Sequence, residues 1–128
     1  MIEIQQRTTK AEQFIDITQK VQAEIPEDFD GICMVYVPHT TAGLTINEHA
    51  DPSVASDILS HLGKLVPKHD GFKHFEGNSD AHIKASIMGA SSMVIVESGK
   101  LQLGTWQGIF FCEFDGPRNR KFQIKLLS

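Results

Sequence analysis

Short apolar runs rich in β-branched residues, each ended by turn residues, are the feature that most constrains the fold of this chain. The clearest of these runs are 31–37, 93–97, 108–114 and 121–127. Each has the length and composition of a strand, and the residues between them, such as Asp115-Gly116-Pro117, are typical of tight turns. Because these strands follow one another without alternating with helices, the pattern argues against a doubly wound parallel sheet.

Two helices are predicted from the signals at their ends. Asp51-Pro52 indicates a helix start, because aspartate is a favoured N-cap and proline suits the first helical position. Apolar residues then recur at helical spacing until Pro67. A second helix is predicted from Ser79 or Asp80 to Met88, where Asp80 is either the N-cap or a site residue.

The remaining segments complete the prediction of one domain. Residues 2–8 alternate as an edge strand does, residues 40–46 are β-prone, and residues 14–18 precede a short helix carrying Val21 and Ile25. Six or seven strands with two or three helices predict a single α+β domain over residues 1–128. We expect packed antiparallel β-sheets in a sandwich-like arrangement.

Composition excludes several classes of protein. A content of 41% hydrophobic and 22% charged residues is that of a soluble globular domain. A net charge of -4 gives no general attraction to nucleic acid, so no nucleic-acid partner is expected. No apolar run reaches the roughly 18 residues of a membrane span, and the start does not resemble a signal peptide. We therefore expect a cytoplasmic protein without membrane contact, with Cys33 and Cys112 as reduced, buried thiols.

Imidazoles, carboxylates and carboxamides are concentrated in two stretches, 39–48 and 74–82. His39 follows an expected strand, His82 lies in the first turn of the second helix, and His74 and Glu76 lie in a long loop. Three histidines from three segments are suited to a His₃ zinc site. With Glu76 or Asp80 nearby, the same groups are suited to polarising or deprotonating a substrate. Both interpretations stay open at this point.

Other side chains are candidates for holding a ligand. Asn47 and Glu48 offer a carboxamide and a carboxylate. Trp106 is either a core or interface anchor or a stacking surface for a heteroaromatic ring. Arg118 and Arg120 are suited to clamping a phosphate, the alternative being surface ion pairs with neighbouring acids.

The motifs, taken together, resemble those of the YjbQ-like family, small proteins described as secondary thiamine-phosphate synthase enzymes. The resemblance covers about residues 3–127, and its most specific marker is Gly104-Thr-Trp-Gln-Gly108. The other matching segments are His39-Thr-Thr-Ala, Asn47-Glu48, Asp51-Pro52, His74 with Glu76-Gly77, and Ala81-His82-Ile83-Lys84. The resemblance implies an α+β fold, a homotrimer, a polar site near the subunit boundaries, and weak formation of thiamine phosphate.

The resemblance, together with the cluster of polar residues, implies a functional hypothesis, a transferase with a weak ability to join a pyrimidine diphosphate to a thiazole phosphate. The expected catalytic residues are His39, Glu48, Glu76 and His82. Residues expected to bind ligand are Asn47, Trp106 and Arg118, and those expected to bind a divalent metal, zinc or magnesium, are His39, His74 and His82. The expected partner is a small phosphorylated heterocycle or anion. The alternatives are a non-catalytic trimer that binds a metal or anionic metabolite, and a metal-assisted hydrolase.

Overall fold

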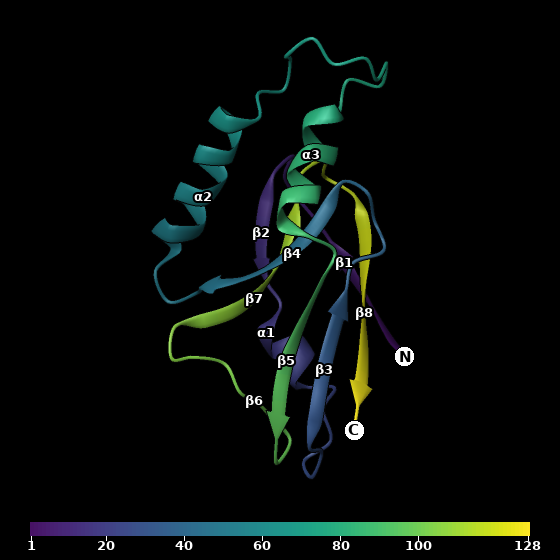
Figure 1. Ribbon diagram of the computed structural model, residues 1–128, viewed down its shortest axis with the longest axis vertical. Coiled ribbons are helices and arrows are strands. Elements are labelled where there is room, and N and C mark those ends of the chain that lie inside the picture. The colour runs from purple at the N-terminus through teal and green to yellow at the C-terminus, as the bar shows by residue number, and fades with distance from the viewer.

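The computed structural model describes all 128 residues and contains two antiparallel sheets (Figure 1). Sheet A has the order β1 (Ile2–Arg7), β8 (Asn119–Leu127), β3 (Gly31–Tyr36), β5 (Ser91–Glu97) and β6 (Lys100–Leu101). Sheet B has the order β2 (Gln13–Asp16), β7 (Gln107–Glu113) and β4 (Ala42–Glu48). The predicted α+β class with packed antiparallel sheets is confirmed, and β1 lies at a sheet edge as predicted.

Three helices join the strands, namely α1 (Thr18–Gln22), α2 (Pro52–Leu65) and α3 (Ser79–Met88). The predicted start of α2 is confirmed, because the Asp51 carboxylate accepts a hydrogen bond from the Ser53 N–H at 2.9 Å. The N-cap role considered for Asp80 is wrong. Asn78 occupies the N-cap position of α3, and Asp80 lies inside the helix, where it pairs with Lys84. None of the three helices has the length and apolar composition that crossing a membrane requires.

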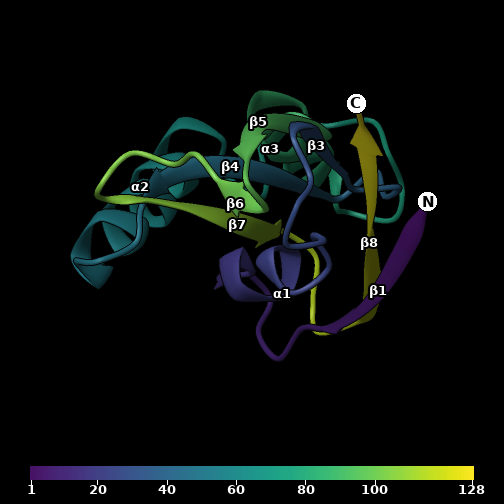
Figure 2. The same cartoon turned by 90° about the horizontal axis from the view of Figure 1, so that it is seen from below.

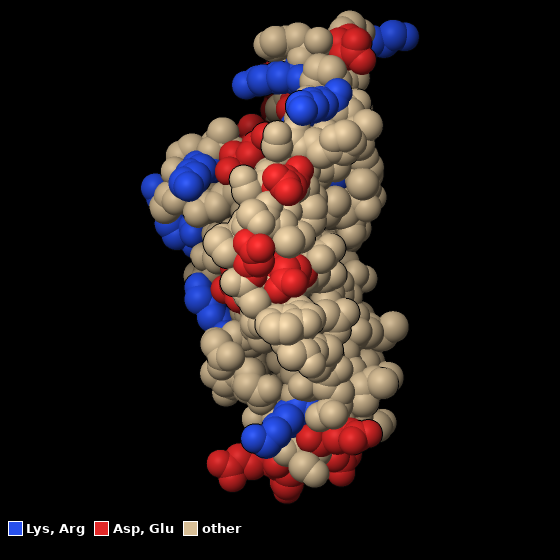
Figure 3. Space-filling model, turned by 90° about the vertical axis from the view of Figure 1, so that its left-hand side faces the viewer, with Lys and Arg blue, Asp and Glu red and all other residues tan.

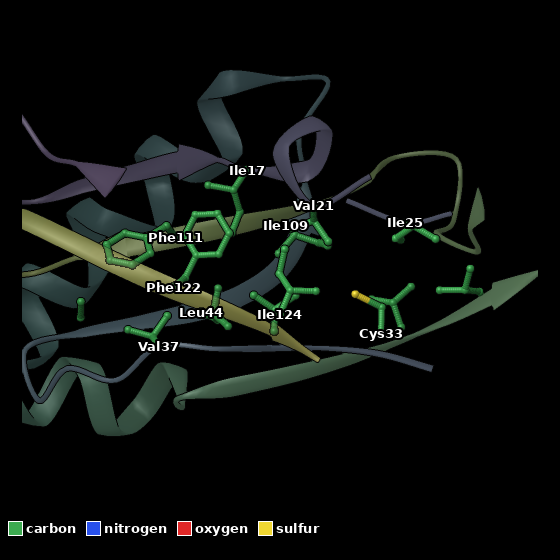
Figure 4. Close-up of a cluster of buried hydrophobic side chains, with 14 residues drawn as sticks. Ile17, Val21, Ile25, Cys33, Val37, Leu44, Ile109, Phe111, Phe122 and Ile124 are labelled. Atoms are coloured by element: carbon green, nitrogen blue, oxygen red, sulfur yellow. The ribbon is translucent and has the colours of Figure 1, made fainter. Parts of the chain in front are cut away.

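The main core lies between the two sheets. Fourteen buried apolar side chains fill it, drawn from both sheets and from α1 (Figure 4). Phe111 of β7 and Phe122 of β8 meet across the layers with ring centroids 6.3 Å apart. Cys33 belongs to this cluster, and burial raises the pKa of its thiol to about 11. The prediction that Cys33 and Cys112 are buried and unpaired is confirmed.

A second, smaller core covers the other face of sheet B, where α2 and α3 pack. Its buried members are Leu62, Ala81, Ala85, Phe110, Cys112 and Phe114. Close packing here depends on Gly43 of β4. A Cβ at that position would lie 2.7 Å from the carbonyl oxygen of Gly89, at the end of α3. The absence of a side chain at Gly43 therefore lets α3 sit directly on the sheet.

Several chain segments meet at one end of the molecule. Beyond β7, residues 114–118 carry the chain from sheet B to sheet A, where β8 begins. The loop that follows β3 rises beside the start of β8 and towards α3 (Figure 1). The two chain termini lie together on one side, beside β1 and β8 (Figures 1 and 2). The His39 segment, the loop before α3 and the start of β8 therefore share one end of the molecule.

We expect Phe111→Ala to lower the free energy of unfolding by about 3–5 kcal/mol, because the truncation leaves a cavity in a fully buried site. Phe75→Ala is the matched control, since the Phe75 side chain is 94% exposed and its loss should change stability by less than about 0.5 kcal/mol. Urea titration of both variants measures the difference. Equal destabilisation by the two variants would contradict the assigned core.

Candidate functional site

A cleft of about 690 Å³ opens where β3 ends, β8 begins and α3 starts. We call it the His39 cleft. Its polar walls include His39, His74, Glu76, Asn78, His82, Asp115, Arg118 and Arg120. The structure thus brings together the three predicted histidines, Glu76 and Arg118 from segments far apart in the sequence.

Arg120, which lines the His39 cleft, forms a buried ion pair with Glu113. Arg120 donates from Nε and Nη2 to the two carboxylate oxygens and from Nη2 to the Thr41 hydroxyl at 2.7 Å. Glu113 also accepts from the Thr8 hydroxyl at 2.7 Å and from the Asp115 N–H at 3.1 Å. Burial alone would raise the pKa of Glu113, but the bonds from Arg120, Thr8 and Asp115 hold it below its usual value. The carboxylate is therefore ionised, and Nη1 of Arg120 makes no hydrogen bond within the protein.

The protonation of His39 is set by its surroundings. Its Nε2 accepts a hydrogen bond from the Lys121 backbone N–H at 3.0 Å, so in the neutral ring the proton lies on Nδ1. Burial, together with the charge of Arg120, lowers the pKa of His39 below its ordinary value of 6.5. At neutral pH His39 is therefore an uncharged donor through Nδ1–H in the wall of the cleft.

His74 and His82 form the other imidazole group of the cleft. Their rings meet edge to face with centroids 5.5 Å apart. Glu76 lies beside them, with Oε1 3.7 Å from Nε2 of His74, an ion-pair distance longer than a hydrogen bond. This group combines two titratable rings with a carboxylate, which suits proton transfer to or from a bound molecule.

The three histidines do not form a metal centre as they stand. No group of three or more His, Cys, Asp or Glu side chains lies close enough together to hold a metal ion. Nε2 of His39 already accepts the Lys121 N–H, so the nitrogen it would offer a metal is engaged. The divalent metal, zinc or magnesium, stays a prediction.

Three predicted site residues lie outside the His39 cleft. Asn47 and Glu48 end β4, far along the strand from His39, and their side chains bond to nearby backbone N–H groups. Trp106 is 62% exposed in the loop before β7, so its interpretation as a core residue is wrong. The structure therefore divides the predicted site between two ends of sheet B.

Arg118 and Arg120 differ in burial, which was not predicted from the sequence. Arg118 pairs with Asp115 at 2.9 Å and is 52% exposed, as the surface ion-pair interpretation expects. Arg120 is 6% exposed and pairs with a fully buried Glu113. A signal for this pair was present, because Glu113 is a single carboxylate inside the apolar run 108–114. Buried acids of this kind require a cationic partner.

We expect His39→Gln to make the stability of the protein less sensitive to acid. Because the pKa of His39 is lower in the folded chain than in the unfolded chain, the unfolded chain binds more protons below pH 6.5. The contribution of His39 is complete above that pH and is lost as the pH falls towards the folded-state pKa. Glutamine keeps an acceptor for the Lys121 N–H but does not titrate. The urea midpoint should therefore drop further between about pH 7.5 and pH 5 in the wild type than in His39→Gln. Equal drops in the two proteins would refute the assigned pKa direction.

Comparisons with known proteins agree with this fold. The family model described as "UPF0047 protein YjbQ-like" matches residues 2–128. A UPF0047 protein of Methanocaldococcus jannaschii is 54% identical, covering 100% of this chain and 94% of its own, and YugU of Bacillus subtilis is 52% identical over 98% and 97%. A crystal structure of a YjbQ/UPF0047 family protein from Clostridium acetobutylicum has a TM-score of 0.95 at 54% identity, covering 99% of this chain and 100% of that one. This chain belongs to the UPF0047 YjbQ-like family.

Proposed function

We propose that the His39 cleft binds a small phosphorylated molecule and that the protein is a transferase acting on it. The observation that carries this proposal is the pair of fixed donors in the cleft, Nη1 of Arg120 and Nδ1–H of His39. Both residues line the cleft and are held by hydrogen bonds through their other nitrogens, so offering the remaining donors to a ligand costs little conformational entropy. Preorganised donors of this kind suit the oxygens of a phosphate.

The arrangement of N–H donors in the His39 cleft, rather than its net charge, favours a phosphate. Arg120 is balanced by Glu113, and Arg118 is balanced by Asp115. Each guanidinium still has N–H groups that its carboxylate does not use, and a planar fork matches phosphate geometry. The cleft therefore favours a ligand whose phosphate oxygens accept several hydrogen bonds over one attracted by charge alone.

The second part of the cleft supplies acid–base chemistry. His74, Glu76 and His82 can move a proton at a ligand whose phosphate is held by Arg120. Thiamine phosphate formation is the specific reaction that we propose to test. In it a thiazole nitrogen bonds to the pyrimidine methylene carbon, the carbon–oxygen bond breaks, and pyrophosphate leaves with its negative charge. Arg118 and Arg120 would stabilise that leaving group.

We expect inorganic phosphate to bind the purified protein and to shift the backbone amide signals of the His39 cleft. The double variant Glu113→Gln/Arg120→Met removes the fixed donor without leaving a buried charge unpaired, and it should weaken binding about tenfold or more. Arg7→Gln is the matched control, because Arg7 is an exposed arginine outside the cleft. Unchanged binding in the double variant would contradict the proposed phosphate site.

Turnover distinguishes an enzyme from a non-catalytic binder. The wild type, freed of the host's thiamine-phosphate synthase, would be given the pyrimidine diphosphate and the thiazole phosphate with Mg²⁺, with Zn²⁺ or with EDTA. Product formation that falls in His82→Ala supports the transferase. Phosphate binding without product supports a binding protein, and binding or turnover that needs a divalent ion supports a metal in the cleft.

The outer face of sheet A supports a further part of the proposal, assembly of copies of this chain. Ile32 of β3 lies opposite Ile95 of β5 and Leu127 of β8. These side chains are 38%, 60% and 43% exposed, and Met93 beside them is 65% exposed. A cluster of exposed apolar side chains on one sheet face is typical of an interface. We propose that this face contacts other copies, in the homotrimer that the family resemblance implies.

We expect the double variant Met93→Lys/Ile95→Lys to shift the mass in solution towards that of the 14.2 kDa chain. Placing two charges on the apolar face makes its burial between copies unfavourable. Light scattering coupled to gel filtration measures the mass. Gln5→Lys is the control, because Gln5 is an exposed polar residue on edge strand β1 of the same sheet. A wild type that is already monomeric would refute the proposed assembly.

A further inference from the structure

A second cleft of about 400 Å³ lies between α2 and sheet B, and we call it the α2 cleft. Its walls include the polar residues Asp16, Glu48 and His49 and the apolar residues Phe14, Leu59 and Phe110. It shares no lining residue with the His39 cleft. Glu48 and its neighbour His49 therefore have surroundings of their own, which the proposed phosphate site does not use.

One wall of the α2 cleft holds an oriented histidine. Nδ1 of His49 lies 2.9 Å from Oδ2 of Asp16, and the backbone N–H of His49 donates to the carbonyl oxygen of Trp106 at 2.9 Å. The ring also occupies the space where Gly108 lacks a side chain, because a Cβ there would lie 2.4 Å from Nδ1 of His49. The hydrogen bond to Asp16 and the space at Gly108 position the imidazole, and the backbone bond to Trp106 positions the residue that carries it.

The Asp16–His49 contact determines which nitrogen faces a ligand. Oδ1 of Asp16 accepts from the backbone N–H and the hydroxyl of Thr18 at 3.0 and 2.6 Å. Burial raises the pKa of Asp16, but the bonds from Thr18 and His49 outweigh it and lower that pKa overall. The ionised carboxylate only accepts hydrogen bonds, so Nδ1 of His49 carries the proton. In the neutral tautomer Nε2 is therefore an acceptor, and no group of the protein donates to it.

The rest of the α2 cleft combines negative charge with an apolar floor. The Glu12 carboxylate pairs with Nζ of Lys84 at 2.6 Å. The charged side chains that remain in the cleft are two carboxylates, Asp16 and Glu48, and one ammonium, Lys10. One oxygen of Glu48 accepts from the Ala50 N–H at 3.0 Å, and the other has no partner. Phe14 and Phe110, with ring centroids 5.9 Å apart, and Leu59 form the apolar surface. On the face that carries α2, acidic side chains gather near its middle (Figure 3).

We propose that the α2 cleft binds an organic ammonium ion, a protonated primary amine carried on an apolar group. The ammonium has only donors, which match the free oxygen of Glu48 and Nε2 of His49. Its charge complements Asp16 and Glu48, and its apolar group covers Phe14, Phe110 and Leu59. A cleft of this size takes a small molecule. An anion in the α2 cleft would meet carboxylates and a histidine acceptor. The α2 cleft therefore favours a cation, whereas the His39 cleft favours an anion.

The test uses 2-phenylethylammonium as the probe and amide signals of the ¹⁵N-labelled full chain as the readout. We expect shifts around Asp16, Glu48 and His49 that saturate, and binding weakened about tenfold in Glu48→Gln, the loss expected for one charge-assisted hydrogen bond. Asp57→Asn is the matched control, because Asp57 is an exposed carboxylate on α2 that does not line the cleft.

Two comparisons make the result decisive. The neutral analogue 2-phenylethanol should bind at least tenfold more weakly than the amine, because it lacks the charge that Asp16 and Glu48 complement. Equal binding of the two, shifts confined to the His39 cleft, or an unchanged affinity in Glu48→Gln would each overturn the proposal. Inorganic phosphate should leave the signals around Glu48 unchanged, so this result and that for the His39 cleft stand independently.

Discussion

The buried pair between Arg120 and Glu113 is the interaction on which the end of the molecule that carries the His39 cleft depends. Glu113 is the last residue of β7 in sheet B, and Arg120 lies at the start of β8 in sheet A. Thr8 and Thr41 complete the hydrogen bonds, so four chain segments are joined at one point. A buried pair is tolerable only when its remaining donors and acceptors are satisfied. Both sheets are thus tied together by the groups that present Nη1 of Arg120 to the cleft.

The elements were predictable where their signals are local. The Asp51-Pro52 start of α2 and the Gly89 end of α3 depend on side-chain chemistry within a few residues, and the strands at 93–97 and 121–127 depend on short apolar runs. The division into two sheets was not predictable. The turn at 115–117 has the composition of a hairpin, yet it connects strands of different sheets, and only tertiary packing decides that.

The candidate site was predictable in part for the same reason. His39, His74, Glu76 and His82 lie at a strand end, in a loop and at a helix start, where ligand-binding groups commonly gather. Glu48 is only nine positions after His39 in the sequence. Most of that segment is strand β4, which ends at Glu48, and an extended strand of seven residues spans about 20 Å. His39 and Glu48 are therefore close in the sequence but far apart in the fold. Asp16 and His49 are 33 positions apart in the sequence, yet their side chains are in contact.

Sheet B positions both clefts through two glycines on neighbouring strands. Gly43 of β4 lets α3 approach until a Cβ would touch Gly89, and this approach sets the place of His82 at the other end of that helix. Gly108 of β7 leaves the space that the His49 ring fills. A side chain at Gly108 would displace the His49 ring, and one at Gly43 would push α3, with His82, away from the sheet. The glycine that closes the Gly104-Thr-Trp-Gln-Gly108 motif is therefore explained by the position of His49, while the histidine-rich stretches contribute side chains to the His39 cleft.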